Sequence, residues 1–145
     1  GYVSDCTRMF SAGPLSDEWM QRLSDMAEIR DSVVESLGRG DYCSEAWEIG
    51  HKKAGEMGYS EHLMGMPPEQ AVFLGHSVGL ELDETPVVAK AFDRELPIGG
   101  TMAIEPKVLY QEGAIGTEDT YTRTSEGMEC LTMGDSWDLM TEWNE

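Results

Sequence analysis

The chain has 145 residues, of which 28 are acidic and 10 are basic, and its formal net charge is −18. Nucleic acids and anionic membrane surfaces repel so acidic a protein, so we expect neither as a partner. The sequence has no apolar run of about 18 residues and no charged-then-apolar leader before Tyr2, so we expect neither a membrane span nor a signal peptide.

Two segments have the apolar spacing of amphipathic helices. The first is expected from Leu15 to Leu37, with Ser16 as its N-cap and Gly38 at its end. The second is expected from Ser44 to Met57, ended by the glycine that follows. The short loop LGRGDYC between them is consistent with two helices packed on one face of a sheet.

The remainder of the chain has the short apolar runs and the Gly and Pro turns of β-structure. Residues 64–69, MGMPPE, contain two consecutive prolines and are therefore expected to form a loop. Strands are expected at Ala71–Leu74, Val78–Leu82, Pro86–Ala89, Thr101–Glu105, Val108–Tyr110, Gly116–Arg123 and Met128–Leu131. Helices followed by many antiparallel strands predict an α+β fold.

One imidazole and three carboxylates are candidate metal ligands. His76 lies in FLGHSVGL, Glu105 in AIEP and Glu118 in GTEDT, which are short apolar or glycine-rich runs. A buried carboxylate is costly unless a cation or hydrogen bonds compensate it, and a divalent ion would compensate all of these groups together. Asp5, in an alternating segment near the first residue, adds another oxygen donor.

These donors also indicate which metals the site would take. Oxygen and imidazole ligands without thiolate suit manganese, iron, cobalt or zinc, so Cys6 is expected to be a neighbour of the site and not a ligand. The cysteines, Cys6, Cys43 and Cys130, are odd in number and lack CxxC spacing. They are interpreted as reduced, buried thiols of a cytoplasmic protein.

Four motifs occur in the order and spacing of a known family: SDCTR near residue 5, GHSVGLE near residue 76, IEP near residue 105 and GTEDT near residue 118. Together they resemble the carboxy-terminal part of the pita-bread metallopeptidases, the group of methionine aminopeptidase, Xaa-Pro aminopeptidase, prolidase and creatinase. The resemblance runs over residues 1–132 and implies an incomplete pita-bread domain, with two helices on a curved, mainly antiparallel sheet. Residues 133–145 would then be an acidic tail that contains tryptophan.

The resemblance assigns roles to the candidate ligands. Asp5 and Glu118 would bridge two divalent ions, and His76 and Glu105 would complete the shell of one of them. Glu105 would also handle the proton during hydrolysis of an amino-terminal or Xaa-Pro peptide bond by a water that bridges the metals. The family's other aspartate precedes the bridging one and has no counterpart here, so we interpret the chain as a fragment that by itself binds metal weakly and has little or no activity.

Several positions depart from the family pattern. The peptidases usually have a histidine where this chain has Asp83, and the proline-directed members often have another at Val72 and an arginine at Gly116. Asp83 either recognises a cationic group of the substrate or is a solvated carboxylate without a role. Lys107, where the aminopeptidases usually have glycine, is expected to pair with a nearby carboxylate. These departures leave a creatinase-like hydrolase or lyase, or a non-catalytic scaffold, as alternatives to a peptidase of small peptides.

The tail MGDSWDLMTEWNE has Trp137, Met140 and Trp143 at spacings of three. This spacing predicts a short amphipathic helix. Its apolar face would dock either on its own domain or on a second subunit, and the second arrangement would give a homodimer.

Overall fold

The computed structural model describes residues 1–132 and 140–142. Its first helix, α1 (Asp17–Arg39), begins at the predicted cap, because Ser16 Oγ accepts a hydrogen bond from the Trp19 N–H at 3.4 Å. The helix does not end at Gly38 but continues to Gly40, whose φ of 93° suits a left-handed cap. Gly38 instead allows α1 to pack closely on the sheet, since a Cβ there would lie 3.2 Å from the Met128 nitrogen.

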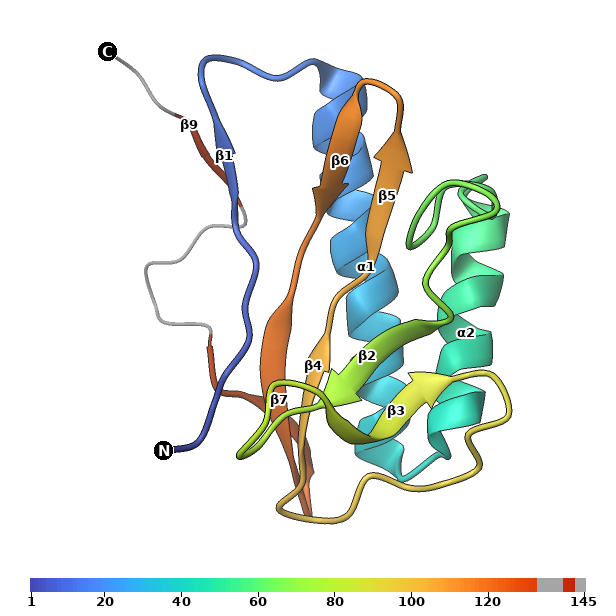
Figure 1. Cartoon of the computed structure of the whole chain (residues 1–145), viewed down its shortest axis with the longest axis vertical. Coiled ribbons are helices and arrows are strands. Elements are labelled where there is room, and N and C mark those ends of the chain that lie inside the picture. The colour runs from blue at the N-terminus through green and yellow to red at the C-terminus, as the bar shows by residue number, and fades with distance from the viewer. Residues whose placement is uncertain (133–139, 143–145) are drawn as a thin grey trace.

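The second helix, α2 (Cys43–Glu56), follows after a short loop and packs beside α1. Its first turn is fixed by the Glu45 carboxylate, which accepts a hydrogen bond from the Tyr42 N–H at 2.7 Å. The chain leaves the helix at Met57 and turns at Gly58, with φ 85°, as the sequence predicted. In Figure 1 the two helices lie side by side behind and to the right of the strands.

The central sheet is antiparallel throughout and has the order β3-β2-β4-β7-β8. Its strands are β2 (Phe73–Ser77), β3 (Glu84–Ala89), β4 (Thr101–Ile104), β7 (Asp119–Thr124) and β8 (Gly127–Cys130). The two helices on this sheet confirm the predicted α+β architecture. Strand β2 extends beyond the predicted Ala71–Leu74 and includes His76.

One predicted strand is wrong. Residues 78–82 alternate in polarity, but they form a turn in which the Gly79 N–H donates to the Glu81 carbonyl at 3.1 Å. The Glu84 carboxylate closes this turn by accepting from the Glu81 N–H at 2.9 Å. Leu80 and Leu82 are consequently exposed, because no neighbouring strand covers them in the described ranges.

Beyond the central sheet, β5 (Lys107–Tyr110) and β6 (Gly113–Gly116) form a separate two-stranded hairpin. The predicted strand Gly116–Arg123 is therefore divided between β6 and β7. Pro106 interrupts the ladder, and its carbonyl accepts from the Thr117 N–H at 3.2 Å across the break. Glu105 and Glu118 both lie in this irregular stretch, one on each side of it.

The tail does not form the predicted helix where the structure describes it. Residues Met140–Glu142 form strand β9, which pairs in parallel with β1 (Met9–Ser11). Figure 1 shows this pair on the opposite side of the molecule from α2. This backbone pairing places residues 140–142 against the amino-terminal part of the same chain. The predicted docking of Trp137 and Trp143 falls outside the described residues.

The core lies between the helices and the central sheet. Its fully buried side chains include Met26, Ile29, Val33, Leu37, Leu74, Val88, Met102 and Ile104. A close approach of α2 to the sheet explains Gly50, where a Cβ would lie 2.6 Å from Leu74 Cδ1. Of the cysteines, Cys43 is buried as predicted, but Cys6 is exposed and Cys130 half-buried, so that prediction is wrong for Cys6.

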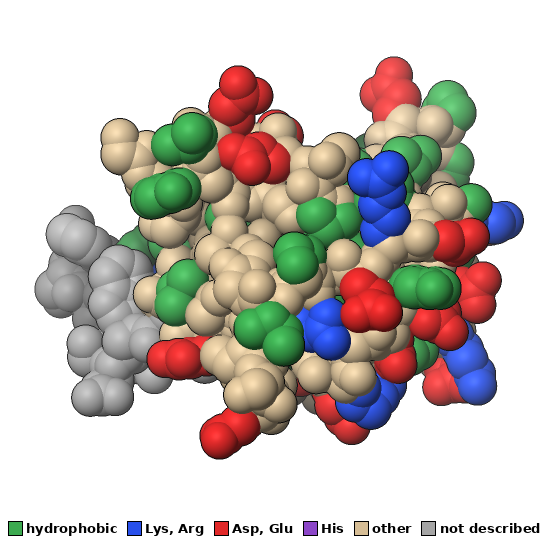
Figure 2. Space-filling model, turned by 90° about the horizontal axis from the view of Figure 1, so that it is seen from below, with side chains coloured by type: hydrophobic (Ala, Val, Ile, Leu, Met, Phe, Trp, Pro, Cys, Tyr) green, Lys and Arg blue, Asp and Glu red, His purple; other side chains and the backbone are tan. Residues whose placement is uncertain are grey.

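On the face seen in Figure 2, the acidic side chains are spread out and do not form one patch. Figure 2 shows acidic side chains around the whole face in view, with basic side chains interspersed among them on one side. Within the described ranges, neither helix is both long enough and apolar enough to cross a membrane.

Candidate metal centre

Asp5 is held beside β7 by the hydroxyl of Thr120. The Asp5 N–H donates to Thr120 Oγ1 at 2.9 Å, and that hydroxyl donates back to the Asp5 carbonyl at 2.8 Å. Two residues later, the Thr7 N–H donates to the Glu118 carbonyl at 3.1 Å. These contacts join two segments that are far apart in the sequence and place Asp5 and Glu118 on adjacent backbones.

His76 reaches the same place from β2, on the other side of β4, and Glu105 reaches it from the end of β4 itself. His76 lies on β2 opposite Ala103 of β4, and Glu105 follows β4 directly. The Glu105 N–H donates to the Leu74 carbonyl at 3.0 Å, which fixes its backbone against β2. His76 Nε2 is consequently 3.6 Å from Glu105 Oε1 and 4.0 Å from Asp5 Oδ2.

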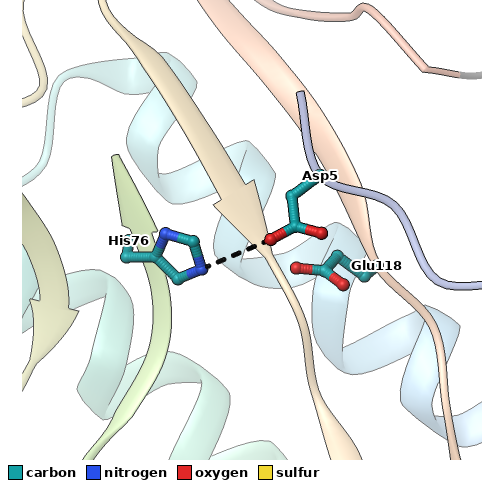
Figure 3. Close-up of side chains that lie close together, drawn as sticks. All are labelled: Asp5, His76 and Glu118. Atoms are coloured by element: carbon teal, nitrogen blue, oxygen red, sulfur yellow. Dashed lines mark ion pairs between the residues drawn. The ribbon is translucent and has the colours of Figure 1, made fainter. Parts of the chain in front are cut away.

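Three of the four predicted ligands therefore converge, and the fourth lies beside them. Donor atoms of Asp5, His76 and Glu118 all lie within 4.8 Å of one another, and Figure 3 shows these side chains pointing toward a common point. Glu105 lies next to this group through His76, while its second oxygen forms an ion pair with Lys107. That ion pair is the one expected for Lys107 from the sequence.

The electrostatics of the cluster favour a cation. Burial raises the pKa of Glu118, and the neighbouring carboxylates of Glu105 and Asp5 raise it further. The Thr7 hydroxyl, which donates to Glu118 Oε2 at 2.6 Å, opposes this shift. A divalent ion would offset the repulsion, and carboxylate with imidazole donors fits manganese, iron, cobalt or zinc.

The ring of His76 is also held on the side away from the cluster. Its Nδ1 lies 3.2 Å from the Ser77 carbonyl and 3.4 Å from Asp83 Oδ1. The Asp83 side chain is 72% exposed. A carboxylate or carbonyl at the second nitrogen of a histidine selects the tautomer that offers the first nitrogen to a metal. Asp83 thus contacts His76 directly, an arrangement the sequence did not predict.

A pocket of about 120 Å³ adjoins the cluster. Its lining includes the charged Glu105, Lys107 and Glu118 and the apolar Met9 and Ile115. The lysine fits because the facing residue is Gly116, where a Cβ would lie 2.5 Å from Lys107 Cβ. The sequence did not predict that the β5–β6 hairpin would line the site.

A comparison with known proteins identifies the family of this chain. Residues 1–125 match the model of metallopeptidase family M24. The chain belongs to this family.

Individual relatives agree with the family assignment. An Xaa-Pro dipeptidase of Pyrococcus horikoshii is 30% identical over 132 residues, which are 90% of this M24 chain and 36% of the relative. The prolidase structure from the same organism has a TM-score of 0.78 at 30% identity and covers 92% of this chain and 37% of that one. A methionine aminopeptidase structure from Rickettsia prowazekii shares the fold, with a TM-score of 0.73 at 15% identity over 91% of this chain and 59% of that one.

These matches confirm the predicted fold class: two helices on a mainly antiparallel sheet, forming part of the pita-bread domain. The M24 chain spans about a third of the length of the curated relatives it matches. The family is one of metallopeptidases, so it implies the use of a divalent metal. Asp5, His76 and Glu118 form a group of side chains that could hold such an ion.

Sequence reasoning missed the residues that support the ligands. The Thr120 hydroxyl binds the backbone of Asp5, and the Thr7 hydroxyl binds the carboxylate of Glu118. Arg8, Arg30 and Asp119 form a buried ion-pair cluster behind these candidate ligands. One signal was present in the sequence. Arg30 interrupts an otherwise apolar helix face, and a charged residue there needs a buried partner.

Proposed function

We propose that the protein is a metal-dependent peptidase that hydrolyses an amino-terminal or Xaa-Pro peptide bond of a small peptide. The observation that carries this proposal is the convergence of Asp5, His76 and Glu118 within 4.8 Å, with Glu105 beside them. The M24 match and the Xaa-Pro dipeptidase relatives support the same reaction class. In the complete site the ligands would hold two ions of manganese, cobalt, zinc or iron.

When bound, the ions would activate a water molecule and polarise the scissile carbonyl. The chain's own groups supply the remainder of the chemistry. Glu105 faces the cluster through Oε1 and is the carboxylate placed to accept the proton from the attacking water. His76 is a ligand oriented by its Nδ1 contacts, so its Nε2 faces Asp5 and Glu105.

We assign Asp83 to the recognition of a cationic amino end of the substrate. It lies at the exposed edge of the site, 3.4 Å from His76, and is free to contact both the imidazole and solvent. The neighbouring pocket, with its apolar lining and Lys107, would accommodate the residue on the other side of the scissile bond. We also propose a cytoplasmic setting, which the three free thiols support.

The alternative is a creatinase-like hydrolase or lyase on the same fold. It is favoured by Val72 and Asp83, which stand where the peptidases often have histidines. Val72 is 75% exposed and offers no side-chain donor or acceptor to a substrate. Such an enzyme would use the same metal ligands but act on a carbon–nitrogen bond outside a peptide.

The test is a substrate panel on the full-length protein loaded with Mn²⁺ or Co²⁺, containing Xaa-Pro dipeptides, amino-terminal peptides and non-peptide amidines. Turnover of the peptides supports the proposal, and turnover of the amidines alone supports the alternative. Failure to bind either metal would overturn both. The isolated 145 residues are expected to bind metal weakly and to hydrolyse the peptides poorly or not at all, which calorimetry and the same panel would measure.

Asp83→Ala separates the two interpretations of that residue. If Asp83 recognises the substrate, KM for peptides with a free amino end rises about tenfold in assays at saturating Mn²⁺, the loss expected for one charge-assisted contact. Saturating metal separates this effect from any weakening of metal binding through the contact of Asp83 with His76. The matched control is Glu81→Ala, which removes an exposed carboxylate from the same turn. Equal kinetics for Asp83→Ala, Glu81→Ala and wild type would show that Asp83 is only a solvated carboxylate.

A further inference from the structure

Asp119, the residue after Glu118, is the most deeply buried carboxylate in the described part of the chain, with an exposed fraction of 0%. It receives hydrogen bonds from three side chains. Arg8 Nη2 lies 2.6 Å from Oδ1, Arg30 Nη1 lies 3.0 Å from Oδ2, and Thr132 Oγ1 lies 2.8 Å from Oδ1. A buried carboxylate needs such partners, so its position and theirs are mutually fixed.

Arg8 connects Asp119 to the backbone of the ligand-bearing segments. Besides its bond to Asp119, it donates from Nη1 to the Glu118 carbonyl at 2.9 Å and to the Thr7 carbonyl at 3.0 Å. One planar guanidinium therefore touches the segment that carries Asp5 and the segment that carries Glu118. The distance between those two segments sets the distance between the two carboxylates.

Arg30 anchors the same point to the helix layer. It lies on the buried face of α1, and its Nη1 contacts Asp119 and also the Thr117 hydroxyl at 3.1 Å. Its other nitrogens pair with Asp31, which is largely exposed. Thr117 and Asp119 lie on either side of Glu118, so α1 holds the backbone around this ligand from behind.

The charges within this cluster are paired. Arg8 and Arg30 carry two positive charges, and the carboxylates of Asp119 and Asp31 carry two negative ones. The cluster therefore acts on the neighbouring segments through the geometry of its hydrogen bonds.

We propose that Asp119, with Arg8 and Arg30, is a positioning device that holds Asp5 and Glu118 at the spacing a metal requires. The inference rests on the proposed function, because it assumes that these two carboxylates are ligands. None of the three residues belongs to the ligand cluster itself. Their effect is exerted through the backbones of residues 5–8 and 117–120.

The experiment compares Asp119→Asn with Arg123→Met in the full-length protein. The asparagine side chain would keep the shape of the aspartate but present an N–H group to one of the arginines. Arg123 is a suitable control because it also lies on β7, is largely buried and pairs with Glu95 at 3.3 Å, but at the opposite end of the strand. The measurements are the Co²⁺ dissociation constant by calorimetry, the visible absorption spectrum of the Co²⁺ form and the free energy of unfolding without metal.

We expect Asp119→Asn to weaken Co²⁺ binding about 10- to 100-fold, as loss of outer contacts to a metal site typically does, and to alter the Co²⁺ spectrum. Arg123→Met should destabilise the metal-free protein but leave both the affinity and the spectrum unchanged. If Asp119→Asn also leaves affinity and spectrum unchanged, the cluster is only structural and the inference is wrong. If the wild-type protein itself binds no Co²⁺, the proposed function fails instead.

Arg8→Lys is the second variant if Asp119→Asn does not fold. Lysine keeps the charge but cannot span Asp119 and the Glu118 carbonyl with a planar fork. We expect the Co²⁺ spectrum to change and the affinity to fall about tenfold, at the low end of the range for such contacts. An unchanged spectrum and affinity in Arg8→Lys would overturn the positioning role.

Discussion

The two sides of the central sheet are held by different forces. On the helix side, α1 and α2 bury an apolar cluster against the sheet, and Leu74 and Ile104 belong to it. On the site side, residues 5–8 meet residues 117–120 through hydroxyl, carboxylate and guanidinium groups. Apolar burial is non-directional and scales with area, whereas these polar contacts act only at one geometry.

The difference separates stability from function. A change on the helix side should mainly alter the free energy of unfolding, because the area buried there is large. A change on the site side should mainly alter metal affinity, because few atoms are involved but each has a fixed partner. The predictions below test this separation, beginning with the largest expected effect.

Leu74→Ala should destabilise the protein by about 2–5 kcal/mol, the usual cost of a cavity at a fully buried leucine. Denaturant unfolding of the metal-free protein measures it. Leu80→Ala is the matched control, since Leu80 is 71% exposed, and it should change stability by less than about 0.5 kcal/mol. Equal losses in the two variants would contradict the assignment of the core.

His76→Ala should reduce Co²⁺ affinity by about 100-fold, which is about 2.7 kcal/mol, while the metal-free protein keeps its stability to within about 1 kcal/mol. Calorimetry measures the Co²⁺ affinity, and denaturant unfolding of the same samples measures the stability of the metal-free protein. His62→Ala removes an imidazole that stacks on Tyr110 away from the cluster, and it should leave metal binding intact. A metal affinity unaffected by His76→Ala would remove this histidine from the site.

Gly50→Ala should destabilise the protein by about 1–3 kcal/mol, although alanine is normally the better helix residue. The reason is space, since the new methyl would lie 2.6 Å from Leu74 Cδ1 and 2.8 Å from Val33 Cγ2. The control is Gly55→Ala in the same helix, where the nearest atom is the movable Ser60 hydroxyl at 3.3 Å. If both variants are stabilised, the helix does not pack on the sheet as closely as described.

Glu118→Gln should slightly stabilise the metal-free protein at neutral pH. Burial raises the pKa of Glu118, so the folded state keeps a proton that the unfolded state releases, and stability falls as pH rises through that interval. Glutamine does not titrate, so the variant keeps its stability as the pH rises, and its side-chain oxygen still accepts a hydrogen bond from the Thr7 hydroxyl. Unfolding at about pH 4, near the ordinary carboxyl pKa, and at about pH 7, well above it, with and without Mn²⁺, measures this difference in stability. The wild type should be the more stable only when the metal is present.

The helix side was largely predictable from the sequence. Apolar spacing located both helices, and Ser16 marked the first N-cap, because capping and amphipathicity are local properties. The failures there were also local. A glycine often ends a helix, but Gly38 lies inside α1 and allows it to pack closely on the sheet. Residues 78–82 alternate in polarity like a strand, although no strand lies beside them in the described part of the chain.

On the site side, the sequence indicated the candidate ligands through the apolar and glycine-rich runs around His76, Glu105 and Glu118, and the family resemblance assigned their roles, which stay predictions. Nothing local in the sequence indicates that Thr120 holds the backbone of Asp5, or that Arg30 crosses from a helix to meet Asp119. Such pairs depend on contacts between distant parts of the chain. The tail illustrates the same limit, since a spacing of three suggested a helix while pairing with β1 makes residues 140–142 a strand.

The order in which the two sides can form follows from the pairing of Thr7 with Glu118. The helix pair joins neighbouring segments, so it closes a short loop and can form while the chain is still being synthesised. The segment that carries Asp5 must wait until residues 117–120 have emerged, and it then closes a loop almost as long as the chain. Contacts of such high sequence separation form slowly. We therefore expect the cluster of Asp5, His76 and Glu118 to assemble late in folding, on a scaffold that the helix side has already built.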